Sequence, residues 1–280
     1  MNIEYFNYLT VPSGGKYRLK EINTKNYIIL LKYLNGDNNK DFFNCLNEII
    51  KESIPDFENF NLLDKAYTFI AFFYYSVKPV LNIKSNIGFE DFLDLADMLN
   101  EIEELYHPIE ISTKIAGYSD CIVSWPSELE LTDENIIGID KSSILKSISG
   151  VNLGNEQRKI LLEHLQAADF NVLYDLYVKH FDITVALFQN TSIAKQFTRC
   201  KLVDIFYLIA NIYKEGLENY YKFIYMLIHY GRLSYSDILL MTPAELSIYY
   251  NNFVEDKEKQ KETNSISTAD PNVNDSLIGL

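Results

Sequence analysis

The sequence predicts a mainly α-helical protein of the α+β class, with two helical lobes, a small β-hairpin insertion and a disordered C-terminal tail. Apolar residues recur at helical spacing through most of the chain. They alternate with polar residues mainly in one central stretch, and they nearly vanish after Val254. We expect the helical lobes at residues 1–107 and 151–254, the insertion at 108–150 and an acidic tail at 255–280.

The composition is that of a folded, acidic protein. Of the 280 residues, 48% are hydrophobic and 14% aromatic, which is too apolar for an intrinsically disordered chain. Lys and Arg number 25 against 39 Asp and Glu, and the net charge of −14 opposes binding to nucleic acid or an anionic membrane. The longest apolar run, at residues 66–77, is shorter than the roughly 20 residues that span a bilayer.

The cysteines and the N-terminus indicate a cytoplasmic protein. Cys45, Cys121 and Cys200 are few, odd in number and widely spaced, which is typical of reduced thiols rather than a disulfide framework. The first residues contain no basic region followed by an apolar one, so we expect no secretory signal.

The N-terminal lobe is expected to begin with a strand and continue with helices. Residues 11–15 have turn composition, and residues 16–22 alternate as a strand does. Thr24 is placed to cap a helix over residues 24–34, and further helices are expected at 41–51 and 62–77. The last of these is apolar nearly all round, which predicts the centre of the core.

The middle of the chain changes from helical to alternating periodicity. Residues 89–106 are patterned as an amphipathic helix that Pro108 stops. Residues 109–125 alternate on both sides of Gly117, which predicts a β-hairpin, and a third strand is expected near residues 129–131.

The C-terminal lobe is expected to be helical again. A helical pattern covers residues 155–189, and two strongly amphipathic helices follow at 202–213 and 217–228. A last helix begins with a capping box, in which Thr242 is the N-cap, Pro243 the first helical residue and Glu245 the third.

Metal sites are incomplete in the sequence. Asp37, Asn39, Asp41 and Glu48 match positions of a calcium loop, but Phe42 stands where the loop needs glycine for its sharp turn. The residues that could bind zinc form no close pair: Cys45, Cys121, Cys200, His107, His164, His180 and His229. We expect no metal and no cofactor.

No catalytic pattern is complete either. The glycines at 14–15 and 150–154 lack the spacing and the Lys-Ser/Thr of a phosphate-binding loop. An acidic stripe lies along the predicted helix 89–106: Glu90, Asp94, Asp97, Glu101 and Glu104. A solvated helix face explains it, and a hydrolase that uses Glu101 and Glu104 as a carboxylate pair is the less favoured reading. The sequence therefore favours a protein that is not an enzyme.

Two features favour protein binding. The chain has 21 Tyr, more than a core usually takes, and tyrosine is favoured at interfaces because it combines apolar area with a hydroxyl. We select Tyr220, Tyr221, Tyr249 and Tyr250 as candidate partner-binding residues. The apolar end of the tail, Leu277, Ile278 and Leu280, either docks into a partner groove or is inert.

Three segments resemble the baseplate hub proteins and hub-assembly chaperones of T-even-like tailed phages. VPSGGKY at residues 11–17 is similar to a Pro-Ser turn before an early strand, and LDKAY at 63–67 to an Asp before a buried helix. HYGRLSYSDI at 229–238, followed by MTPAE at 241–245, resembles the closing helix-turn-helix of phage tail-assembly proteins.

This resemblance implies a non-enzymatic role in building the hub, as a chaperone or a hub subunit. It adds Met241, Thr242, Pro243 and Glu245 to the candidate partner-binding residues. Its implied partners are other hub or tape-measure proteins, with a homo-oligomer as a further possibility. The implied location is the bacterial host cytoplasm or the virion tail baseplate. An unrelated cytosolic helical adaptor or scaffold remains the alternative.

Overall fold

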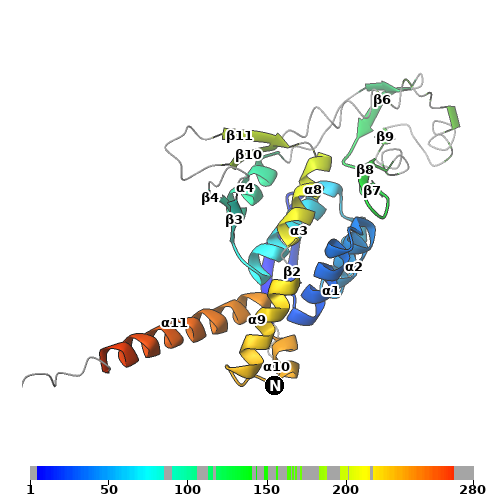
Figure 1. The fold of residues 1–280 in the computed structure, drawn as a ribbon. Coiled ribbons are helices and arrows are strands. Elements are labelled where there is room, and N and C mark those ends of the chain that lie inside the picture. Colours follow the sequence, from blue (N-terminus) through cyan, green and yellow to red (C-terminus); the bar gives the residue numbers. More distant parts are fainter. Residues whose placement is uncertain are drawn as a thin grey trace, which may run out of the picture.

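The computed structural model describes most of the N-terminal and C-terminal regions and part of the middle. The described residues are 5–84, 90–105, 113–115, 118–140, 143, 148–150, 183–187, 196–200, 202–214 and 217–267, with isolated residues between 156 and 171. Within them the protein is mainly helical with several small antiparallel sheets, as the α+β class predicts (Figure 1). Most residues of the helices expected over 155–182 lie outside the described residues.

The chain begins with a hairpin and three helices. Strands β1 (Phe6–Thr10) and β2 (Lys16–Lys20) pair in antiparallel fashion, and Gly14 takes a positive φ of 91° in the predicted turn. Helices α1 (Thr24–Asn35), α2 (Asn39–Lys51) and α3 (Leu62–Ser76) follow, with a short 3₁₀ turn, η1 (Phe57–Asn59), before α3. These elements confirm the predicted strand and helices.

The cap of α1 differs from the prediction by one residue. Asn23 is the N-cap, and its side chain accepts a hydrogen bond from the Asn26 amide at 2.9 Å. Thr24 is instead the first helical residue. It is buried, and its amide donates to the carbonyl of Met241 at 2.8 Å. The residue expected to cap the helix therefore bonds to a residue far away in the sequence.

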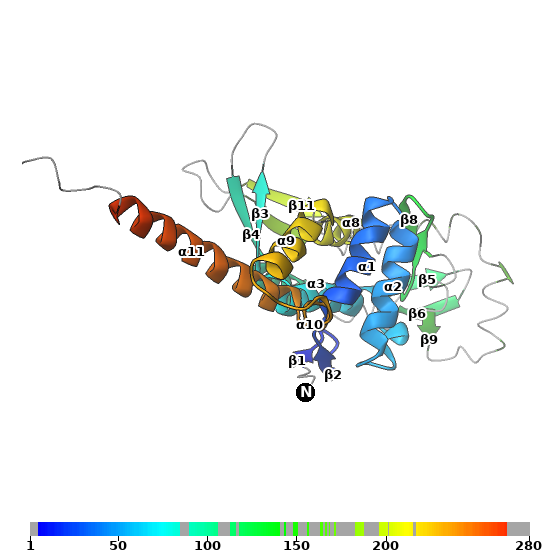
Figure 2. The same ribbon diagram turned by 60° about the horizontal axis from the view of Figure 1, so that its bottom comes forward.

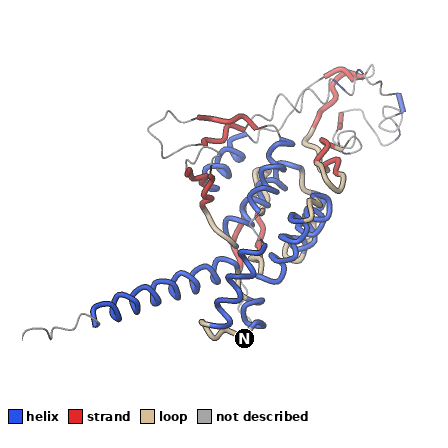
Figure 3. The backbone as a smooth tube through the Cα atoms, in the orientation of Figure 1, coloured by secondary structure: helices blue, strands red, loops and turns tan. Residues whose placement is uncertain are grey.

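Small antiparallel sheets lie at the periphery of the helical body (Figure 3). Strands β3 (Val80–Lys84) and β4 (Glu90–Asp94) pair before helix α4 (Leu95–Leu105). Strands β5 (Thr113–Ile115) and β6 (Tyr118–Val123) form the predicted hairpin, and β9 (Ile148–Gly150) extends it on the β6 side. The predicted third strand exists as β7 (Leu129–Leu131), but it pairs with β8 (Ile136–Ile139) rather than with the hairpin.

Two helical predictions are wrong where the structure forms strands. Residues 90–94, expected in a helix, form β4, because they pair along their length with β3. The five residues of β10 (Ile183–Leu187), expected at the end of a helical region, pair with β11 (Gln196–Cys200). Three of the five, Ile183, Thr184 and Val185, are β-branched residues that suit a strand once a partner strand is present.

The chain ends with four helices, α8 (Leu202–Tyr213), α9 (Leu217–His229), α10 (Tyr235–Leu240) and α11 (Pro243–Ser267). Helix α11 extends away from the rest of the molecule (Figures 1 and 2). It includes residues 255–267, which we expected to be disordered. Strong helix formers and charge pairs four residues apart, such as Glu255 with Lys259 at 3.8 Å, favour this continuation. The rest of the expected tail, 268–280, lies outside the described residues.

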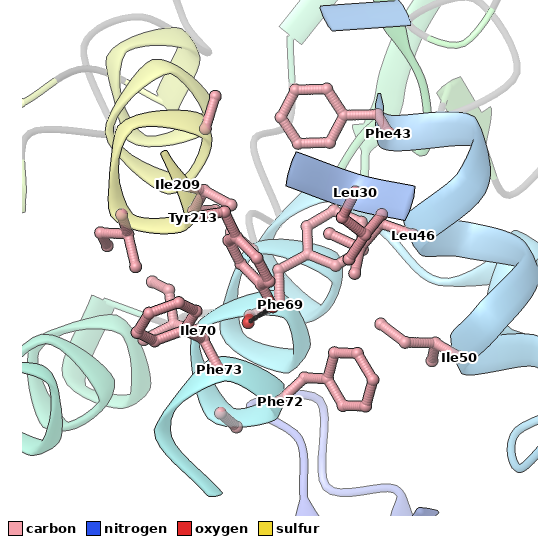
Figure 4. Packing of buried hydrophobic residues seen from close by; sticks show 14 of the residues in the cluster. Leu30, Phe43, Leu46, Ile50, Phe69, Ile70, Phe72, Phe73, Ile209 and Tyr213 are labelled. Carbon is pink, nitrogen blue, oxygen red and sulfur yellow. Dashed lines mark hydrogen bonds between the residues drawn. The ribbon is translucent and has the colours of Figure 1, made fainter. Parts of the chain in front are cut away.

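Helices from both ends of the chain share one hydrophobic core. Phe43 of α2, Phe69 of α3 and Ile209 of α8 point into the same interior (Figure 4). The fully buried Tyr213 of α8 donates a hydrogen bond to the Phe69 carbonyl at 2.8 Å (Figure 4). The described parts of the two expected lobes are therefore packed together as one unit, and not as two separate cores.

Candidate functional site

Helix α9 separates a buried face from an exposed aromatic face. Tyr220, Ile224 and Leu227 follow the helical repeat and are buried against the core. Tyr221 and Tyr225, four residues apart, lie on the exposed side, and the Tyr225 side chain is 56% exposed. The ring centroids of His229 and Tyr225 are 4.0 Å apart, so this aromatic row continues to the end of the helix.

The turn between α9 and α10 depends on a close backbone approach. A Cβ at Gly231 would lie 2.7 Å from the carbonyl oxygen of Leu227, so only glycine fits without a shift. The next residue, Arg232, has a φ of 55°, and the Leu233 amide then donates to the Leu227 carbonyl at 3.3 Å. The close backbone approach gives a structural reason for Gly231 in the third resembling segment.

The start of α11 confirms the predicted capping box. The Thr242 hydroxyl accepts from the Glu245 amide at 3.1 Å, and Glu245 Oε2 accepts from the Thr242 amide at 2.9 Å. The Glu245 carboxylate also accepts a hydrogen bond from the Tyr5 hydroxyl, which raises the pKa of Tyr5 above its usual value. The box thereby fixes α11 beside the N-terminal segment.

Exposed apolar side chains gather on α9, α10, α11 and the turn after α9. Of the eleven large hydrophobic residues exposed in the described part of the chain, seven belong to this region. We name these seven the α9–α11 aromatic surface: Tyr221, Tyr225, Tyr230, Tyr235, Leu240, Ile248 and Tyr249. Their side chains can supply apolar contact area, and the tyrosines among them can also form hydrogen bonds to a partner.

The charges around this surface are of both signs. Lys222 forms an ion pair with Glu218 at 2.8 Å, and this contact lowers the pKa of the Glu218 carboxyl. Both side chains are exposed, so the pair contributes little to stability. An exposed ion pair therefore lies beside Tyr221 and Tyr225 on α9.

The structure divides the predicted partner-binding residues into two groups. Tyr221 and Tyr249 are exposed and belong to the α9–α11 aromatic surface. Tyr220 is only 8% exposed, and its ring packs edge-on against Tyr27 at 5.4 Å, because the helical phase of α9 points it at α1. Tyr250 is half-buried against Phe223, with 4.5 Å between ring centroids.

The residues added by the family resemblance have structural contacts. Thr242 and Pro243 are buried and start α11, while Glu245 completes the capping box. Met241 is half-buried, and its carbonyl accepts from the Thr24 amide. These four residues hold the exposed surface in place rather than forming it. The predicted tail residues Leu277, Ile278 and Leu280 lie outside the described part of the chain.

Five members of the surface were missed at the sequence level. Tyr225 stands four residues after Tyr221 and opposite the apolar stripe of α9, so helical phase could have revealed it. Ile248 precedes Tyr249 on the side of α11 away from the buried Leu246. Tyr230, Tyr235 and Leu240 carry no such signal, because they lie in or beside short turns.

The candidate metal and catalytic residues are not assembled into sites in the described structure. Asp41 and Glu48 belong to helix α2, so residues 39–48 cannot wrap around a calcium ion. Within the described ranges, no group of three or more His, Cys, Asp or Glu side chains could hold a metal ion. Glu101 and Glu104 lie on α4, and between them Glu103 accepts from the Tyr67 hydroxyl at 2.6 Å.

Among the helices in the described part of the chain, none combines the length and the apolar character needed to cross a bilayer.

Two of the resembling segments meet in space. The Ser13 amide, in the segment at 11–17, donates to Asp64 Oδ1, in the segment at 63–67, at 3.0 Å. The Asn61 side chain donates to the other carboxylate oxygen of Asp64 at 2.8 Å. Asp64 thus joins the N-terminal hairpin to the start of α3.

Comparisons with known proteins gave no match: no protein-family model, no curated protein and no solved structure is significantly similar to this chain.

Proposed function

We propose that this chain is a non-enzymatic protein of phage tail assembly that helps to build the baseplate hub, as a chaperone or as a hub subunit. It works by binding other hub or tape-measure proteins, in the bacterial host cytoplasm or in the tail baseplate of the virion. The α9–α11 aromatic surface is the observation that carries the binding role. The three resembling segments supply the link to phage hubs.

The chemistry of the surface suits protein recognition. Tyrosine side chains lose little conformational entropy on binding and are enriched among residues that dominate binding energy. The surface is carried by helices anchored to the core through buried Leu227, Ile238 and Leu246, so it is largely formed before a partner arrives.

Mixing the purified protein with hub and tape-measure components tests the proposal. We expect a complex that co-elutes in size-exclusion chromatography. A triple variant, Tyr225→Ser, Leu240→Ser and Ile248→Ser, removes one exposed side chain from each helix. Because interface anchors typically contribute more than about 1 kcal/mol each, the variant should lose at least about a hundredfold in affinity.

The matched control is Tyr8→Ser. Tyr8 lies on β1 and is 87% exposed, so its replacement changes a surface aromatic residue away from α9–α11. The control should retain full affinity. Absence of any hub or tape-measure protein from the complex would contradict the hub assignment, and capture of an unrelated cytosolic protein would favour an adaptor instead. Equal affinity of the triple variant and of Tyr8→Ser would exclude the α9–α11 aromatic surface as the binding site.

A further inference from the structure

A concave site lies on a different part of the molecule from the α9–α11 aromatic surface, between α2, α3, α8 and β7. It has a volume of about 390 Å³, which is within the range of ligand pockets. None of the seven residues of the α9–α11 aromatic surface contributes to it. Its side chains include an apolar floor, a buried lysine, an asparagine and a carboxylate-rich border.

The floor consists of three phenylalanines from three helices. Phe43, Phe69 and Phe206 lie with ring centroids 5.8 to 6.2 Å apart, in tilted and edge-to-face arrangements. They belong to the core and are held there by their mutual contacts. These side chains are only 1 to 2% exposed, and the half-buried Leu129 and Leu131 add accessible apolar area beside them, so the cavity favours an aromatic or branched aliphatic group.

Lys65 places a cationic donor beside this floor. Its residue is 8% exposed, and its ammonium donates to the Ser127 carbonyl at 2.7 Å. An ammonium has three donors, so this bond leaves capacity for an acceptor from a ligand. Burial lowers the pKa of Lys65 to about 8, so the group is still mainly charged at neutral pH.

Asn47 supplies an acceptor that the described residues leave unsatisfied. Its Oδ1 atom is buried and has no hydrogen-bond partner among the described residues. Buried polar atoms in native proteins nearly always have a partner, because an unpaired one costs about 1 to 3 kcal/mol. Asn47 lines the same cavity as Lys65, so a ligand with a donor would satisfy it.

These groups together select a class of ligand. The ligand needs an acceptor for Lys65, a donor for Asn47 and an apolar group for the floor. A peptide segment has all three, because its backbone carries both C=O and N–H groups beside each side chain. Glutamates 48, 58 and 128 line the cavity with lysines 51 and 65. Lys51 pairs with Glu48 at 3.2 Å and with Glu58 at 3.0 Å, so the three carboxylates exceed the two ammonium groups by one charge, in a chain whose net charge is −14. Basic flanking residues therefore complement the border.

We propose that this cavity binds an extended segment of a partner protein, in which one large apolar side chain is flanked by lysine or arginine. The apolar side chain rests on the phenylalanine floor. The backbone of the segment bonds to Lys65 and Asn47, and its basic residues face the glutamates. This recognition does not depend on the hub assignment, since it uses a different set of residues.

A random heptapeptide library displayed for selection tests the proposal. The full chain and an Asn47→Leu variant serve as parallel baits. Leucine has the same number and branching of side-chain heavy atoms as asparagine and removes the unsatisfied acceptor, so the variant should unfold at the same or a higher temperature. Peptides enriched on the wild type alone should contain a Trp, Phe or Leu beside Lys or Arg. Their affinity for the variant should fall roughly tenfold.

Further variants separate the cavity from other binding sites. Lys65→Met and Glu128→Gln should each lower the affinity for the selected peptides, whereas the triple variant of the α9–α11 aromatic surface should bind them with the affinity of the wild type. Peptides that bind the α9–α11 aromatic surface would be enriched equally on both baits, and this equal enrichment distinguishes them from peptides that bind the cavity. No enrichment on the wild type over Asn47→Leu, or enrichment of acidic peptides, would overturn the proposal. Because these outcomes do not involve hub proteins, they leave the proposed function untouched.

Discussion

Single hydrogen bonds connect parts of this chain that are far apart in the sequence. The amides of Ser13 and Thr24 bond to Asp64 and to the Met241 carbonyl, and the Tyr213 hydroxyl bonds to the Phe69 carbonyl. Each bond contributes only about 0.5 to 1.5 kcal/mol net, but each also fixes the position of a helix end.

The capping box of α11 is one set of hydrogen bonds that fixes a helix end. Replacing Thr242 by Ala removes the acceptor for the Glu245 amide and should lower the free energy of unfolding by about 1 kcal/mol. Urea denaturation measures this change. Ser247→Ala, in the exposed interior of the same helix, is the control and should alter stability by less than about 0.5 kcal/mol. Equal losses in both variants would mean that the cap does not stabilise α11.

Lys65 predicts a pH dependence of stability. Its pKa is about 8 in the folded protein and 10.5 when unperturbed, so between these values the unfolded chain binds more protons. The contribution of Lys65 to the free energy of unfolding therefore rises with pH over this window and is constant below it. Its total size is up to about 3 kcal/mol.

The comparison with Lys65→Met isolates this effect, because other titrating groups are common to both proteins. The free energy of unfolding of wild type minus that of Lys65→Met, from urea denaturation, should increase between pH 8 and pH 10. A difference that stays constant across this range would show that Lys65 is not held in a desolvating environment.

At the scale of elements, local patterns predicted helices well and strands poorly. Helices α1, α3, α8, α9 and the start of α11 follow from apolar periodicity and caps, which are properties of neighbouring residues. Strands β4 and β10 depend on partners at 80–84 and 196–200, and no local pattern identifies those pairings. The sequence grouped Tyr220 with Tyr221 as candidate partner-binding residues, and the packing of α9 against α1 separates the buried Tyr220 from the exposed Tyr221.

Residues 255–267 form the C-terminal half of helix α11. Deleting residues 255–280 removes the helical segment 255–267, while the buried Leu246 and the half-buried Tyr250 remain. The far-UV circular dichroism per molecule should lose the signal of these helical residues, and the melting temperature should change by less than about 2 °C, because this segment adds little to the core. If the segment were disordered, the deletion would leave the helical signal per molecule unchanged.

At the scale of the whole molecule, the shared core couples the two ends of the chain. Helix α8 contacts α1 and α3, and α1 also contacts α9 and α10. The surface proposed to bind partners is thus supported by helices from the N-terminal half. The cavity beside Lys65 likewise combines α2 and α3 with Phe206 of α8.

This coupling predicts how a core substitution spreads. Phe206 is 1% exposed and packs on Phe43 and Phe69, so Phe206→Ala should lower the free energy of unfolding by about 3 to 5 kcal/mol. Because the core is shared, the amides of α1 and α3 should lose protection together with those of α8 in hydrogen exchange followed by mass spectrometry. Two independent lobes would behave differently, since only α8 to α11 would exchange faster while α3 kept its protection. Tyr225→Ala, on the exposed face of α9, is the control and should leave all three helices protected.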